Sequence, residues 1–224
     1  MIRKRDLLSL IEYFKRVEEG KEKLDEKFSL SNYYHITNIV KANLTEKGNL
    51  RITCYLEFIP IKSGIKETLM GYTHFEVNNL PIAKLIYLKR ENVLTNEKLN
   101  TYFEIEKKSD HEIILKAKYE PSLRVGERVK WKYSVLFKNY PIMNEDSYTI
   151  QVGSPTRYIK LLIYLPRIIK NAEVYKTIAG FKATTGKSPL LTEKHTFLIS
   201  NNMIKLELWD VHHSAYKVEW KLEE

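Results

Sequence analysis

The chain has 224 residues, a length that fits one large domain or two small ones. Hydrophobic residues make up 43% and aromatic residues 12%, which excludes a disordered or low-complexity chain. The single cysteine, Cys54, excludes an intrachain disulfide framework and a thiolate zinc cage, whereas the formal net charge of +9 is the unusual feature.

The N-terminal segment predicts an amphipathic helix followed by a charged linker, together residues 1–28. Leu7, Ile11 and Phe14 recur at helical spacing, Asp6 is a candidate N-cap, and Gly20 favours the helix end. An isolated helix of this length is only marginally stable, so its apolar stripe needs a surface to cover. Packing on the chain's own sheet is the favoured interpretation. The alternative is a partner-binding helix anchored by Leu7, Ile11 and Phe14.

No apolar segment follows the positively charged N-terminus, and no apolar run approaches the roughly 20 residues that a membrane span needs. We therefore expect a cytoplasmic protein without a membrane span.

From about residue 30 the hydrophobic period becomes two. Residues 51–58 alternate as in a strand with one solvent-exposed face: one side carries Ile52, Cys54, Leu56 and Phe58, and the other carries Arg51, Thr53, Tyr55 and Glu57. Further strands are expected at residues 36–42, 82–89, 102–106, 112–119, 128–138, 148–152, 158–165, 175–182, 195–199, 203–209 and 216–222.

Turn residues separate these strands. Gly48 is free to adopt a positive φ, and Ser200–Met203 has the composition of a tight hairpin. The pattern predicts an all-β fold, an antiparallel β-sandwich over residues 29–224 preceded by the N-terminal α-helix. The sandwich is either one large unit or two in tandem, and a weak boundary is placed near Ser109.

One turn has a more specific pattern. Residues 119–127 contain Pro121, Leu123, Gly126 and Glu127 in a Pro-x-Leu-x-x-Gly-Glu arrangement, and an alternating strand follows. This resembles a turn of immunoglobulin-like β-sandwich modules. The resemblance implies a sandwich architecture and, because such modules mostly bind other molecules, a binding role. The paired cysteines of antibody domains are absent.

Catalytic and cofactor motifs are weak. The loop at residues 180–188 resembles a phosphate-binding loop, but five residues separate its glycines where the motif has four. Asp210 and His212 would share one face of a strand and offer two metal ligands. A catalytic zinc site needs a third protein ligand, and no residue nearby in the sequence has the spacing of one. Cys54 lies on an apolar strand face, as a packing residue does. We therefore expect no enzyme, cofactor or metal site, and keep a metal-dependent hydrolase using Asp210 and His212 as the second alternative.

The positive charge is local. Residues 118–170 contain 10 Lys and Arg against 4 Asp and Glu, a difference of +6 out of the total of +9. If residues 112–119 and 128–138 pair as an antiparallel hairpin, Lys118 lies opposite Lys130 and Lys116 opposite Lys132. Trp131 and Tyr133 then point to the apolar side.

This register predicts a basic patch made of Lys116, Lys118, Lys130, Lys132 and Arg128. We interpret the chain as a non-enzymatic binding or regulatory module whose basic sheet face engages a protein partner or an anionic ligand. A nucleic-acid-binding protein is the first alternative, although the inward aromatics leave no stacking surface between the lysines. The simplest competing interpretation is a solvated strand face that keeps the sheet soluble.

Overall fold

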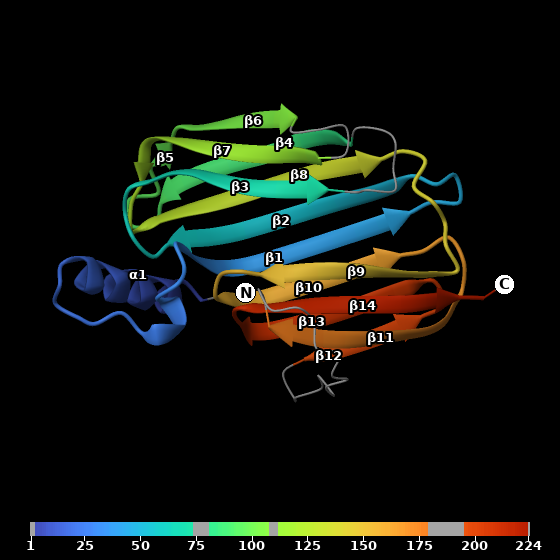
Figure 1. Ribbon diagram of the computed structural model, residues 1–224. Helices are drawn as coiled ribbons and strands as arrows, with labels where there is room; N and C mark the ends of the chain where they lie inside the picture. The colour runs from blue at the N-terminus through green and yellow to red at the C-terminus, as the bar shows by residue number, and fades with distance from the viewer. Residues whose placement is uncertain (1–2, 74–80, 108–111, 179–194, 224) are drawn as a thin grey trace.

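The computed structural model describes residues 3–73, 81–107, 112–178 and 195–223. Helix α1 (Lys4–Glu18) and the short 3-10 helix η1 (Glu26–Phe28) precede an all-strand region (Figure 1). The predicted fold class, an all-β fold with an N-terminal helix, is confirmed. No helix among these residues is long and apolar enough to cross a membrane.

One layer is an eight-stranded sheet, here called the large sheet. In spatial order its strands are β12 (Thr196–Ser200), β13 (Met203–Val211), β10 (Thr156–Tyr164), β1 (Tyr33–Leu44), β2 (Leu50–Pro60), β8 (Glu127–Phe137), β4 (Ile82–Asn92) and β5 (Lys98–Leu99). Neighbouring strands are antiparallel except β1 and β10, which run parallel.

Two three-stranded sheets form the second layer, side by side in front of the large sheet (Figure 1). The β3 sheet consists of β3 (Ile65–Thr73), β7 (Glu112–Leu123) and β6 (Thr101–Lys107), and the β9 sheet of β11 (Ile169–Ile178), β14 (Ser214–Leu222) and β9 (Glu145–Val152). β3 and β9 are the strands at the facing edges of these two sheets (Figure 1).

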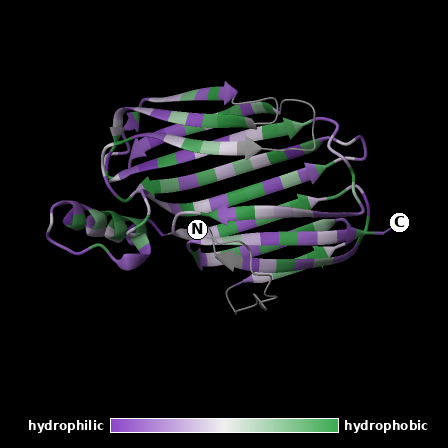
Figure 2. Ribbon diagram, viewed as in Figure 1, coloured by the Kyte–Doolittle hydropathy of each residue, from purple (hydrophilic) through white to green (hydrophobic). Residues whose placement is uncertain are grey.

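Alternating side chains build one core between the layers. Along the strands apolar residues alternate with polar ones, visible as alternating bands in Figure 2. The core extends from Val40 to Leu222 and contains residues from all three sheets, such as Leu115, Trp131 and Val218. The ring of Phe103 on β6 lies 6.1 Å from that of Trp131 on β8. Ser109 lies outside the described residues, and core residues come from both sides of it in the chain.

Helix α1 covers the outer side of one end of the large sheet. Leu7, Ile11 and Phe14 are only 2%, 1% and 0% exposed, and they pack in a second core cluster with residues such as Ile36 and Ile59. The predicted stripe is therefore correct, and the helix docks on its own chain. The alternative that these three residues anchor a partner is wrong for this structure, because burial in the cluster removes them from the surface.

The predicted hairpin between residues 112–119 and 128–138 is also wrong. β7 pairs with β3 and β6, whereas β8 pairs with β2 and β4 in the opposite layer. Their apolar faces do meet, but across the core and not side by side in one sheet. Lys116 and Lys118 consequently point to the opposite side of the sandwich from Lys130 and Lys132.

The turn between β7 and β8, where the chain passes from one layer to the other, is fixed by a buried ion pair. Arg90 on β4 has a fully buried side chain, and its Nη2 lies 2.7 Å from the Oε2 atom of Glu127. The same guanidinium donates to the carbonyl oxygens of Pro121 at 2.6 Å and Ser122 at 3.0 Å. Glu127 also accepts the Arg124 N–H at 3.1 Å. A single guanidinium thus links both layers at the turn.

Removing this guanidinium should destabilise the fold strongly. Arg90→Met leaves the buried Glu127 carboxylate without its cation and the carbonyls of Asn100, Pro121 and Ser122 without their guanidinium donor, so we expect a loss of about 3–5 kcal/mol in the free energy of unfolding. Urea unfolding measures the difference. The control Lys89→Met alters the exposed neighbour on the opposite strand face and should change stability by less than about 0.5 kcal/mol. An equally small effect of Arg90→Met would contradict the structural role of the pair.

His35 gives the fold a pH dependence. It lies on the inner face of β1 beside the rings of Tyr33 and Phe58, and burial lowers its pKa from 6.5 to about 4. The unfolded chain therefore takes up this proton before the folded protein does. The contribution to stability is complete above pH 6.5 and is lost as the pH falls toward 4, by at most about 3 kcal/mol.

His35→Gln should reduce this pH dependence, because an amide does not titrate in that range. The measurement is urea unfolding of both proteins at several pH values between 4 and 7. Parallel stability curves for the two proteins would show that His35 does not titrate differently in the folded and unfolded states.

Candidate ligand-binding face

The structure divides the predicted basic patch between the two layers. Lys116 and Lys118 lie on the outer face of the β3 sheet, where Lys116 pairs with Glu106 and the Lys118 Nζ atom lies 2.7 Å from Glu104. The hydrogen bond to Glu106 raises the pKa of Lys116. These two lysines form a ladder of exposed ion pairs, the arrangement of a solvated sheet face.

Arg128, Lys130 and Lys132 alternate along β8 on the outer face of the large sheet. The neighbouring strands add further cations to this face, so that Lys and Arg outnumber Glu on it. The cations are Lys41, Arg51, Lys84, Lys89, Arg128, Lys130, Lys132, Lys160 and Lys205, and the carboxylates are Glu57, Glu91 and Glu207. We call this surface the basic face.

Aromatic side chains lie between these cations, because strands far apart in the sequence are neighbours in the sheet. Lys132 has Tyr55 as its cross-strand partner on one side and Tyr87 on the other. The two tyrosine rings lie 6.4 Å apart at an angle of 66°. Within the described part of the chain, no carboxylate lies within ion-pairing distance of Lys132. Its ammonium group is therefore available to an anion.

A second aromatic pair lies toward the other edge of the basic face. The rings of Tyr158 on β10 and Trp209 on β13 are 4.4 Å apart; Lys160 lies one alternate position further along β10, and Lys205 two alternate positions along β13. Further along β1 and β10, the Lys41 ammonium lies 4.7 Å from the ring centre of Tyr164. The face therefore combines apolar rings with cations across several strands, which sequence inspection of β8 alone could not reveal.

The cations of the basic face keep its carboxylates Glu91 and Glu207 ionised. Burial acts to raise the pKa of Glu91, but its hydrogen bond to Arg128 and the charge of Lys130 hold that pKa below its usual range. Burial acts in the same way on Glu207, and Lys205 and Tyr158 lower its pKa overall. Both groups stay ionised at neutral pH and leave a net positive surface.

The basic face is hollowed where α1 meets the sheet. A depression of about 510 Å³ there is bordered by Lys4 of the helix, by Tyr55 and Tyr158, and by Arg128 and Lys130. Burial raises the pKa of Tyr55, and its hydroxyl donates to Glu57 at 2.8 Å. Burial likewise raises the pKa of Tyr158. These phenols therefore remain neutral donors at physiological pH, beside two cations.

Among the described residues, the structure does not assemble a metal site around the candidate ligands of the sequence analysis. Asp210 and His212 lie beside η1 at a small depression of about 260 Å³, and His195 is placed elsewhere, with its Nδ1 atom accepting the Trp209 N–H at 3.4 Å. In the described ranges, no three His, Cys, Asp or Glu side chains gather as metal ligands. Cys54 is 3% exposed in the core, and the loop at residues 180–188 lies outside the described residues.

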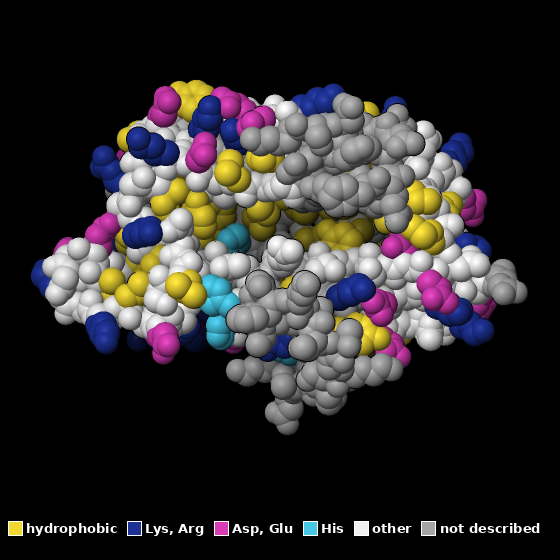
Figure 3. All heavy atoms as spheres, viewed as in Figure 1, with side chains coloured by type: hydrophobic (Ala, Val, Ile, Leu, Met, Phe, Trp, Pro, Cys, Tyr) yellow, Lys and Arg dark blue, Asp and Glu magenta, His cyan; other side chains and the backbone are white. Residues whose placement is uncertain are grey.

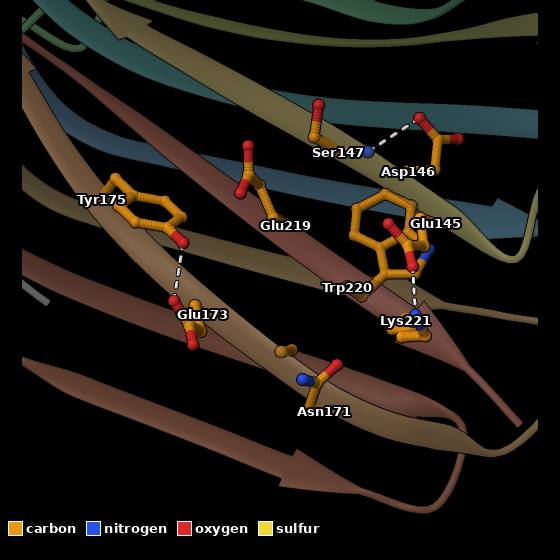
Figure 4. A pocket seen from close by; sticks show the side chains of 10 residues that line it. Glu145, Asp146, Ser147, Asn171, Glu173, Tyr175, Glu219, Trp220 and Lys221 are labelled. Carbon is orange, nitrogen blue, oxygen red and sulfur yellow. Dashed lines mark hydrogen bonds and ion pairs between the residues drawn. The ribbon is translucent and has the colours of Figure 1, made fainter. Parts of the chain in front are cut away.

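A further depression lies on the outer face of the β9 sheet (Figure 4). Its volume is about 560 Å³, and some of its side chains contact each other: Lys221 pairs with Glu145, and the Tyr175 hydroxyl donates to Glu173 at 2.6 Å. This hydrogen bond raises the pKa of Tyr175 to about 12. Its lining contains four carboxylates, those of Glu145, Asp146, Glu173 and Glu219, against the single cation Lys221, so this surface is acidic where the basic face is positive, and we assign no site to it.

Comparisons with known proteins give the fold alone. No protein-family model and no curated protein matches the sequence. The solved structure of a putative protease from Parabacteroides distasonis has a TM-score of 0.55 and 11% identity; the match covers 86% of this chain and 41% of that one. This chain therefore spans less than half the length of that protein.

Two further solved structures are less similar. A carbohydrate-binding CBM3a-L domain from the Clostridium thermocellum scaffoldin cipA has a TM-score of 0.34 and 12% identity, covering 49% of this chain and 69% of that one. Yeast LTA4 hydrolase has a TM-score of 0.37 and 7% identity, covering 91% of this chain and 32% of that one. No protein-family model supports the immunoglobulin-like resemblance of the β7–β8 turn.

Proposed function

We propose that the protein is a non-enzymatic binding module that engages an anionic ligand through the basic face. The single observation that supports this most directly is Lys132, an ammonium without a carboxylate partner among the described residues, flanked by two tyrosine rings. Like charges gathered on one sheet face repel each other, and an anionic ligand relieves that repulsion. The aromatic rings supply apolar contact area beside the charges.

Two double variants that remove the same charge test this proposal. Lys130→Gln with Lys132→Gln alters the basic face, and Lys116→Gln with Lys118→Gln alters the opposite side of the sandwich. Using heparin as a polyanionic probe, we expect the first pair to weaken binding roughly tenfold and to make it less dependent on salt. The second pair should leave both quantities nearly unchanged. Equal effects of the two double variants on heparin binding would contradict the proposal, because the affinity would then depend on total charge and not on the basic face.

A nucleic acid is the second candidate ligand. The observation that favours it is the placement of Tyr55, Tyr87, Tyr158 and Trp209 between the cations, because unstacked bases bind on aromatic rings beside a positively charged track. The inward orientation of Trp131 and Tyr133 is as predicted, so these stacking candidates come from other strands.

Tyr87→Leu distinguishes a nucleic acid from other polyanions. If bases stack on this ring, the affinity for a single-stranded oligothymidylate should fall by about 1–3 kcal/mol, whereas heparin, which has no bases, should bind as before. Tyr102→Leu on the β3 sheet is the matched control, since Tyr102 is an exposed tyrosine away from the basic face. Fluorescence anisotropy gives both affinities. An equal loss for both probes argues against stacking.

A further inference from the structure

The gap between the β3 and β9 sheets forms a trough on the side of the molecule opposite the basic face. In Figure 3 the front of the molecule is hollowed between these sheets, and hydrophobic side chains gather in the hollow. The cavity measures about 570 Å³, within the usual range for ligand sites. Its lining residues come from β1, β2, β3, β9, the end of β8 and the loop that follows β8: Asn38, Val40, Leu50, Ile52, Cys54, Met70, Gly71, Phe137, Tyr140, Ser147, Tyr148, Thr149, Ile150 and Gln151.

The chemistry of the trough differs from that of the rest of the surface. None of these described lining residues is charged, although charged residues make up 29% of the chain. Val40, Ile52 and Cys54 form an apolar floor on the inner face of the large sheet. The Oδ1 atom of Asn38 is buried there without a hydrogen-bond partner among the described residues. An occupant should therefore be uncharged, largely apolar, and able to donate one hydrogen bond.

The walls of the trough are strand edges. β3 and β9 each have a strand neighbour on one side only, so alternate backbone N–H and C=O groups on the other side are directed away from the sheet. Some edge groups are already satisfied: the Tyr33 hydroxyl donates to the Glu67 carbonyl at 2.9 Å, and the Ser147 N–H donates to Asp146 at 2.7 Å. Around Gly71 and Thr149, no described side chain caps the backbone.

We propose that an extended, uncharged polypeptide segment of a partner protein binds in the trough as an added strand between β3 and β9. Its main chain would pair with both edges and join the two small sheets into one layer. Alternate side chains would lie over the floor of the trough, where Val40 and Ile52 are 6% and 5% exposed, and a donor on the segment would approach the Asn38 amide. This site lies on the other side of the large sheet from the basic face and does not depend on the function proposed above.

The site can be tested with two glycine variants of the full chain. Gly71 lines the trough and Gly153, just after β9, does not; a Cβ atom at either position meets nothing within 4 Å. The probe is a phage-displayed pool of random peptides of about ten residues, from which binders to the wild-type protein are selected and synthesised. Gly71→Lys should weaken their binding by at least about tenfold, because a lysine on an edge opposes strand addition. Gly153→Lys should leave it unchanged.

Cys54 is an internal reporter, because it is the only cysteine of the chain and lies on the trough floor. A bound peptide should slow its reaction with a small thiol reagent and increase amide protection in β3 and β9 together. Asn38→Leu should weaken peptide binding without loss of stability, since it removes a buried carbonyl that has no partner.

Three results would overturn the proposal. The first is the selection of no binders, and the second is equal binding by the two lysine variants. The third is full protection of the facing edges of β3 and β9 in the free protein, which would mean that the chain itself fills the trough.

Discussion

The buried ion pair between Arg90 and Glu127 is the constraint on which the two-layer arrangement depends. It lies at the turn where the chain leaves β7 in one layer and enters β8 in the other. A buried guanidinium is tolerated only when its donors are satisfied, and here the carboxylate and the carbonyls of Pro121 and Ser122 accept them. These partners come from both layers, so the guanidinium connects β4 and β8 of the large sheet to the end of β7 in the β3 sheet. It stabilises the turn at the point where the chain changes layer.

This change of layer determines where the positive charge lies. Lys116 and Lys118 are close to Lys130 and Lys132 in sequence, but the core separates the two pairs. On the β3 sheet the first pair meets Glu104 and Glu106, and the charges cancel. On the large sheet the second pair joins cations from strands before and after it in the chain. The charge excess of one sequence block thus becomes a property of one sheet face.

Local features of the sequence were sufficient to predict most of the strands, several turns and the helix, although the N-cap of the helix is Arg3 and the predicted N-cap Asp6 lies in its first turn. Leu7, Ile11 and Phe14 follow a helical period, and the Ser200–Met203 hairpin and the positive φ of Gly48 are as expected from residue type. Strand pairing could not be predicted in this way, because the apolar faces of β7 and β8 match equally well within one sheet or across a core. β3 was missed, since Gly71 and several charged residues weaken its alternation. Tyr55, Tyr87, Tyr158 and Trp209 each lie on a predicted strand, but only the strand order makes them neighbours.

The alternation of β2 gives the large sheet two faces with opposite chemistry. Tyr55 and Glu57 point to the basic face, whereas Ile52 and Cys54 point to the trough floor. Binding of the proposed anionic ligand to the first face would be electrostatic, and added salt would weaken it because charges further apart than about one Debye length are screened. Binding of the proposed segment in the trough would rely on main-chain hydrogen bonds and apolar contact, which salt does not screen. Because one strand contributes to both surfaces without sharing a side chain between them, the two can be occupied together. Their different responses to ionic strength make it possible to separate the two contributions in one protein.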